Sequence, residues 1–276
     1  MVVQWFPGHM SKALRQMKEK LGLIEVVFEL VDARVPISSS NPFVTEMIQG
    51  KPKVILLNKM DKADPQRTKE WVNHYKDLGI VAVPVNALNG DGVNRIVGAA
   101  KEVLKEKIEK DRANGLKERA IRALIVGIPN VGKSTLINRL ANRKATVIGD
   151  RPGITKVQQW IKVGNELELL DTPGVLWNKF ENQEIGLRLA LTGAIKDEIL
   201  PVDDVVIYGI KFFLEHHPSR LIERYKTEST DPIEILDHIG KIRGARRGGE
   251  TDYDRVFTIF LNDLRGGLLG RVTFDV

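Results

Sequence analysis

The sequence contains no cysteine, which excludes disulfides, thiolate metal sites and a cysteine nucleophile. It also lacks any apolar run near the ~20 residues that a membrane-spanning helix needs. The densest apolar stretches, residues 54–57 and 123–126, have the length of strands. The first residues show no basic-then-apolar signal layout. We therefore expect a soluble, cytoplasmic protein with no membrane partner.

The composition is that of a folded protein, with 42% hydrophobic and 28% charged residues over 276 positions. At about 100–200 residues per domain, this length predicts one large domain or two. Residues 1–176 hold 28 Lys and Arg against 19 Asp and Glu, whereas residues 177–276 hold 14 against 17. The net charges are therefore +9 and −3. This asymmetry suggests two units, and the basic surface is typical either of a nucleic-acid partner or of a generically basic protein.

The first part of the chain alternates strand-like and helix-like segments. Short, branched apolar runs predict buried parallel strands at 24–31, 53–57, 80–85 and 123–126. Helical periodicity predicts helices over 65–78 and 91–110. Segments 157–163 and 167–170, separated by Gly164-Asn165, predict a hairpin. Together these elements predict a doubly wound, mostly parallel α/β sheet.

From residue 184 onward the strand pattern stops. Helices are predicted at 203–215, 218–225, 232–239 and 251–264, several of them opening on Asp, Ser or Pro. Residues 244–249 (GARRGG) are predicted to form a flexible basic loop. This half of the chain is therefore expected to be a small all-helical domain.

Residues 127–134 (GIPNVGKS) fit the phosphate-loop pattern GxxxxGK[ST]. Glycines let backbone N–H groups curl around a phosphate, and the following helix adds its positive end. Lys133 would reach the β- and γ-phosphates, and the Ser134 hydroxyl would bind Mg²⁺. A purely structural glycine turn is the alternative. The candidate phosphate-binding residues are Asn130, Val131, Gly132, Lys133, Ser134, Thr135 and Gly174.

Residues 171–174 (DTPG) follow the last of these apolar strands. Asp171 can hold Mg²⁺, usually through a water, and Gly174 can offer its N–H to a γ-phosphate. Alone, these four residues could spell a plain turn. About 40 residues after a phosphate loop, they are its expected partner.

Residues 58–61 (NKMD) follow the strand predicted at 53–57. Asp61 can accept hydrogen bonds from N1–H and N2–H₂ of guanine, which adenine cannot supply. Asn58 can contact the Hoogsteen edge, and the stem of Lys59 can stack on the base. The string resembles the NKxD motif of GTPases, although alone it could be a helix start.

Two shorter motifs complete the set. Asn86-Ala87-Leu88 resembles the SAL/SAK loop, in which the Ala N–H meets guanine O6, although Asn86 replaces the usual Ser. Pro152-Gly153-Ile154-Thr155 lies where a switch I loop is expected. Thr155 is then a candidate ligand of Mg²⁺ beside the γ-phosphate, with a capping or turn threonine as the alternative.

The order of the motifs is unusual. The base-reading motifs precede the phosphate loop and the DTPG string, whereas ordinary GTPases run the other way. The chain therefore resembles the circularly permuted ribosome-assembly GTPases of the YlqF-like family, whose signatures are also matched by 5–10 (WFPGHM) and 32–36 (DARVP). The resemblance covers essentially the whole chain. It implies a permuted P-loop GTPase domain over 1–177 and a helical RNA- and ribosome-binding domain over 178–276.

The resemblance also implies an activity. It predicts a GTPase that uses GTP/GDP and Mg²⁺ and is stimulated by the large ribosomal subunit precursor. We expect the protein to be a monomer. Val175 stands where many GTPases carry a water-orienting Gln, so another group must position the water. His9 is our candidate, because an imidazole can orient a water near neutral pH; a structural His is the alternative. Asn130 resembles the Asn of GTPases that bind K⁺ beside the phosphates.

The basic residues near 241–247 are the candidate contacts to rRNA, with a solvated loop as the alternative. No aromatics are interleaved among them, which favours phosphate and shape contacts over base reading. A GTPase in tRNA modification or stress signalling, and a nucleotide-dependent RNA-binding scaffold, are the competing functions. The candidate RNA-binding residues are Lys241, Arg243, Arg246 and Arg247.

Overall fold

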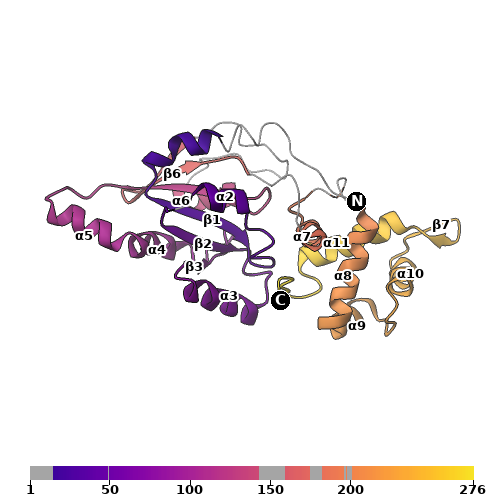
Figure 1. Ribbon diagram of the computed structural model, residues 1–276. Helices are drawn as coiled ribbons and strands as arrows, with labels where there is room; N and C mark the ends of the chain where they lie inside the picture. The colour runs from indigo at the N-terminus through magenta and orange to yellow at the C-terminus, as the bar shows by residue number, and fades with distance from the viewer. Residues whose placement is uncertain (1–14, 49, 143–158, 175–181, 196, 198–200) are drawn as a thin grey trace.

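The computed structural model describes residues 15–48, 50–142, 159–174, 182–195, 197 and 201–276. Its first part is a six-stranded sheet in the order β3-β2-β1-β4-β6-β5 (Figure 1). The strands are β1 (Val26–Asp32), β2 (Lys53–Asn58), β3 (Val81–Pro84), β4 (Ile121–Gly127), β5 (Gln159–Val163) and β6 (Leu167–Asp171). The first five strands of that order run parallel, and β5 is antiparallel to β6. The predicted strands and hairpin are thereby confirmed.

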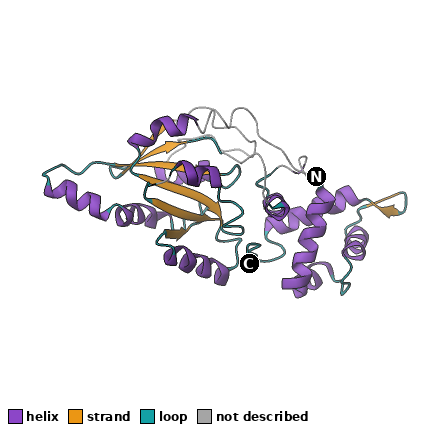
Figure 2. Cartoon of the chain, in the orientation of Figure 1, coloured by secondary structure: helices purple, strands orange, loops and turns teal. Residues whose placement is uncertain are grey.

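The central strands are apolar because helices cover both faces of the sheet (Figure 2). Every residue of β1 is buried, whereas the edge strand β5 alternates and leaves Trp160 and Lys162 exposed. The covering elements are η1 (Leu21–Leu23), α2 (Pro42–Met47), α3 (Pro65–Asp77), η2 (Val93–Arg95), α4 (Ile96–Val103) and α6 (Lys133–Ala141), whereas α5 (Lys105–Ala113) extends beyond the sheet (Figure 1).

One helix prediction was wrong in its extent. The segment 91–110 is not one helix, because Gly92 adopts a left-handed φ of 77° and α4 begins at Ile96. A Cβ on Gly92 would lie 2.2 Å from the Pro84 carbonyl oxygen, so this turn requires glycine. Leu104 then leaves the helical region with φ −102° and ψ 8°. It is the last buried residue of the apolar stripe, and α5 beyond it buries none.

The rest of the described chain is mainly helical, as predicted. It contains α7 (Gln183–Leu191), α8 (Val202–His216), α9 (Pro218–Tyr225), α10 (Pro232–Ile242) and α11 (Tyr253–Gly266), with a small hairpin of β7 (Arg246–Arg247) and β8 (Glu250–Thr251). The prediction of a flexible loop over 244–249 is therefore wrong, because residues 246–249 belong to this hairpin. Gly248 and Gly249, at φ 62° and 93°, form the two-residue turn that pairs its strands.

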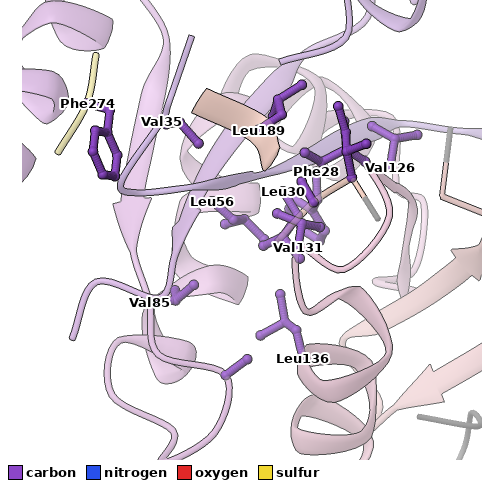
Figure 3. Close-up of a cluster of buried hydrophobic side chains, with 14 of the residues drawn as sticks. Phe28, Leu30, Val35, Leu56, Val85, Val126, Val131, Leu136, Leu189 and Phe274 are labelled. Atoms are coloured by element: carbon purple, nitrogen blue, oxygen red, sulfur yellow. The ribbon is translucent and has the colours of Figure 1, made fainter. Parts of the chain in front are cut away.

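The core is continuous from the sheet into the helical region. Leu189 of α7 and Phe274 belong to the same buried cluster as Leu30 and Leu56 of the sheet (Figure 3). Burying a phenylalanine completely contributes about 1.5–3 kcal/mol. Phe274 is 0% exposed and packs against Phe212 of α8, at 4.7 Å between ring centroids.

A C-terminal tail, residues 272–275, returns to the sheet region. Phe274 N donates to the Arg34 carbonyl oxygen at 2.7 Å. The Asp275 carboxylate accepts from Ile37 N, Ser38 N and Ser38 Oγ at 2.6–2.9 Å and from Arg188 of α7 at 3.2 Å. The boundary predicted at residue 177 lies outside the described residues and stays a prediction. No helix in the described part is long and apolar enough to cross a membrane.

Candidate nucleotide-binding site

The predicted motifs meet at one edge of the sheet. In parallel strands the carboxyl ends lie side by side, and loops after them form the binding crevice of open α/β sheets. Asp32 at the end of β1 pairs in register with Asn58 at the end of β2. Leu30 of β1 pairs with Gly127 of β4, and Ile125 of β4 pairs with Asp171 of β6. The permuted order of the chain therefore still brings base and phosphate motifs together.

The phosphate loop connects β4 to α6. Asn130 and Gly132 both adopt left-handed backbone angles, with φ of 57° and 98°. A Cβ on Gly132 would lie 2.3 Å from Asn58 Nδ2, and a Cβ on Gly127 would lie 2.7 Å from the Leu30 carbonyl oxygen. Both positions therefore require glycine because of close packing. Helix α6 begins at Lys133 and directs its positive end at this loop, as a phosphate site requires.

Lys133 and Asp171 form a buried ion pair inside this loop. Lys133 Nζ lies 2.6 Å from Asp171 Oδ1, and the two side chains are 7% and 0% exposed. Asp171 Oδ2 is buried and has no hydrogen-bond partner among the described residues. A buried carboxylate oxygen without a partner is costly unless a cation or water satisfies it. This buried, unpaired oxygen beside the Lys133 ion pair fits the predicted role of Asp171 toward Mg²⁺.

The DTPG segment packs against the phosphate loop. Thr172 Oγ1 donates to the Ile125 carbonyl oxygen at 2.8 Å, which anchors the end of β6 on β4. A Cβ on Gly174 would lie 3.0 Å from Pro129 Cα. Gly174 therefore lies against the phosphate loop, where its N–H was predicted to meet a phosphate.

Asn58 cross-links three loops. Its Nδ2 donates to the Val131 carbonyl oxygen at 2.7 Å, and its Oδ1 accepts from Ala87 N at 3.0 Å. The sequence assigned Asn58 to the Hoogsteen edge of guanine and the Ala87 N–H to guanine O6. In the structure these groups bind each other, and the residue is 2% exposed. Their contacts to the base stay predictions, while their structural role is to join the base loops to the phosphate loop.

Lys59 and Asp61 follow Asn58 in the loop after β2. Lys59 Nζ donates to the Asn130 carbonyl oxygen at 2.9 Å and lies 3.0 Å from Asp32 Oδ2. Burial lowers the pKa of Lys59, and the charge of Asp32 opposes that shift. Asp61 is half-buried, and its contact to guanine stays a prediction.

Asn86 holds the loop after β3. Its Oδ1 accepts from Leu88 N at 2.9 Å and from Asn89 N at 3.3 Å, as in an Asx turn. Asn86 stands where the related motif has Ser, and its side chain shapes the loop that carries Ala87.

The phosphate loop also touches the helical region. Asn130 Nδ2 donates to the Gly193 carbonyl oxygen, just beyond α7, at 3.2 Å. Its amide oxygen is the atom that a K⁺ ion would use, so this bond orients the side chain without consuming that oxygen. The potassium role itself stays a prediction.

The predicted RNA contacts lie at the end of α10 and on β7, elements that Figure 1 shows in the helical region and not beside the sheet. Lys241, Arg243, Arg246 and Arg247 are all exposed. Arg243 lies 3.7 Å from Asp263, which is more closely bound by Arg224. The hairpin therefore presents Arg246 and Arg247 as exposed charges on a short strand. His9, Thr155 and Val175 lie outside the described residues.

Two site residues were missed from the sequence. Asp32 and Arg34 of the DARVP string are 1% and 2% exposed, and Asp32 lies 3.0 Å from Lys59 Nζ in the loop after β2. The signal was present, because a charged pair at the end of an apolar strand is rarely buried without a purpose.

Fold, phosphate loop and strand order define the class: a circularly permuted P-loop GTPase. A family model described as 50S ribosome-binding GTPase matches residues 122–246. Ribosome biogenesis GTPase A of Bacillus pumilus is 54% identical over 100% of this chain and 99% of its own length. That of Thermotoga maritima is 33% identical over 99% and 94%. GDP-bound YlqF of T. maritima has a TM-score of 0.67 at 29% identity, covering 95% of this chain and 98% of its own.

The chain belongs to the ribosome biogenesis GTPase A family. The permuted GTPase fold and the resemblance to the YlqF-like family are thus confirmed. The protein hydrolyses GTP and acts in ribosome assembly.

Proposed function

We propose that this GTPase binds the large ribosomal subunit precursor and its rRNA, and that its nucleotide state controls docking and release. The observation that carries the proposal is the contact of one phosphate-loop residue, Asn130, with both regions. Its carbonyl oxygen accepts from Lys59 of the base loop, and its side chain donates to Gly193 beside α7. A change at the phosphates can therefore reach the helical region directly.

The proposed chemistry uses the phosphate-loop and DTPG residues of the structure together with Thr155, which the sequence alone assigns. The Lys133 ammonium and the N–H groups of residues 130–135 and 174 neutralise phosphate charge as it develops. Ser134, Asp171 and Thr155 would hold Mg²⁺, which supplies further charge stabilisation when bound. Asp61 selects guanine. Asn130 would hold K⁺ next to the phosphates.

His9 is proposed to orient the attacking water, since an aliphatic Val175 cannot. His9→Ala is expected to leave GDP affinity unchanged and to lower subunit-stimulated hydrolysis about 100-fold or more, because general acid–base groups contribute ~10²–10⁴-fold. Full stimulated hydrolysis in this variant would remove His9 from the mechanism.

The exposed cations of the hairpin support the RNA part of the proposal. Arg246 and Arg247 carry a basic face on a region whose net charge is negative, so binding there depends on local charge. A bovine relative, mitochondrial ribosome-associated GTPase 1, is 32% identical over 99% of this chain. We further propose a monomer with domains at 1–177 and 178–276, acting in the cytoplasm.

Hydrolysis measured with purified ribosomal particles tests the proposal. GTP turnover should rise with large subunits and stay at its basal value with small subunits or tRNA at equal concentration. Stimulation by tRNA would favour a role in tRNA modification instead. Nucleotide-dependent binding to large subunits without stimulated turnover would favour a scaffold.

A further inference from the structure

Asp32 is a buried carboxylate that the phosphate chemistry does not use. It ends β1 and is 1% exposed. Arg34 binds it through two parallel bonds, with Nε 2.9 Å from Oδ1 and Nη2 2.7 Å from Oδ2. The second partner is Lys59, whose Nζ lies 3.0 Å from Oδ2. One acid therefore serves two cations at the border of the base crevice.

Lys59 depends on anchors at both of its ends. Its backbone has a φ of 59°, an unfavourable left-handed angle for a residue other than glycine. Its ammonium is held by Asp32 and by the Asn130 carbonyl oxygen. A free lysine side chain carries about 2 kcal/mol of rotamer entropy. If the lysine stem is to lie flat against a base, its rotamer entropy must already be lost before the base binds. Of the two groups that hold the ammonium, the charged Asp32 carboxylate binds more strongly than the neutral Asn130 carbonyl oxygen.

The charges around Lys59 make the acid necessary. Arg34 is a second buried cation and repels Lys59, while burial disfavours the charged ammonium. Asp32 is the group whose charge opposes both effects, and the two cations hold the pKa of Asp32 far below its usual range. Without the carboxylate, the ammonium would be driven out toward solvent and would take the stem with it.

We propose that Asp32 is a positioning residue for guanine recognition: it fixes the Lys59 ammonium so that the lysine stem is held ready against the face of the purine. The inference rests on the proposed place of Lys59 in the base site.

Arg34 keeps the carboxylate in place. Besides its bonds to Asp32, its Nη2 donates to the Thr192 carbonyl oxygen at 3.0 Å, and its own carbonyl oxygen accepts from Phe274 N at 2.7 Å. Arg34 N also donates to Asp32 Oδ1 at 3.1 Å. The Asp-x-Arg spacing of the DARVP string is thereby explained, because two residues are the separation that permits this set of bonds.

A double-mutant cycle tests the proposal. Asp32→Asn, Lys59→Met and the double variant are titrated with a fluorescent N-methylanthraniloyl GDP. Each single change should weaken binding about tenfold, and the double variant should be no weaker than Lys59→Met alone. In steady-state hydrolysis, Asp32→Asn should raise KM and leave kcat within about twofold, because the acid acts on base binding and not on the chemical step.

Asp275→Asn is the matched control. It disturbs another buried carboxylate, which holds the same loop through Ile37 and Ser38 and does not contact Lys59. It should lower Tm and leave GDP affinity unchanged. Should Asp32→Asn fail to fold, Asp32→Glu replaces it, since a longer carboxylate in this closed space must displace the ammonium and weaken binding.

The outcomes separate the two ideas. Unchanged affinity in Lys59→Met would remove Lys59 from the base site and the inference with it. If Lys59→Met weakens binding but Asp32→Asn, or Asp32→Glu in its place, binds as tightly as the wild type, only the inference is overturned. The same holds if the Asp32 change costs an equal factor in the Lys59→Met background, because Asp32 would then act on the fold generally.

Discussion

The cations of the nucleotide site and those of the C-terminal hairpin carry the same charge but differ in burial and in their pairing with carboxylates. Lys133 and Arg34 are buried and bound to carboxylates at 2.6 and 2.7 Å. Arg246 and Arg247 are exposed on a two-residue strand. Buried, paired cations are preorganised, and their interactions resist salt, whereas exposed cations act through a screened field. The chain thus has preorganised, buried cations in the nucleotide site and exposed cations, whose attraction depends on salt, in the hairpin.

Lys133→Met should have the largest effect on the nucleotide site. It removes the charge that phosphates meet and leaves both oxygens of buried Asp171 without a cation. We expect GDP affinity to fall about 100-fold or more, in line with the 2–5 kcal/mol cost of breaking a buried charge pair. Fluorescent GDP titration measures it. The control is Lys101→Met, an exposed lysine paired with Glu166 on the surface, which should leave affinity unchanged.

Asp61→Asn should change the base specificity of the nucleotide site. Losing the carboxylate removes hydrogen bonds to a charged group worth about 2 kcal/mol, or roughly 30-fold in GDP affinity. Xanthine carries a carbonyl in place of the exocyclic amine, so xanthosine diphosphate should bind the variant better than GDP does. Competition between the two nucleotides tests this, and a variant that still prefers GDP would remove Asp61 from base reading.

The hairpin side is tested by the pair Arg246→Gln and Arg247→Gln. Affinity for large-subunit rRNA fragments should fall about tenfold at low salt, and the slope of log affinity against log salt should shrink by about 2. GDP affinity should not change. Arg67→Gln with Lys69→Gln, two exposed positions on α3, is the charge-matched control. An equal loss in that control would show that only bulk charge matters.

The smallest expected effect concerns Asn130, where the two regions touch. If its amide oxygen binds K⁺, hydrolysis should be a few-fold faster in K⁺ than in Na⁺ buffer, and Asn130→Ala should abolish that difference. Equal rates in both buffers for the unchanged protein would exclude the potassium role.

The phosphate loop was predictable because its function lies in eight adjacent residues whose spacing is fixed by backbone geometry. The strands were predictable because burial on both faces demands unbroken apolar runs. Asn58 shows the limit: its partners, Val131 and Ala87, are brought to it by tertiary packing, so its local motif indicated a base contact while the structure uses it as a cross-link. The bond of Arg34 to Thr192 spans 158 positions and has no local signal.

The C-terminal tail has a consequence for how the protein is made. Ile37 and Asp275, which share a hydrogen bond, are 238 residues apart. At a synthesis rate of about 5–20 residues per second, the loop that holds Ile37 waits roughly 12–50 s for its partner. Helix α8, which packs against Phe274, is itself complete only after residue 216, so this part of the core forms late in synthesis. The contacts of Phe274 and Asp275 with the Arg34 loop therefore join the core long after the sheet residues that they cover have been made.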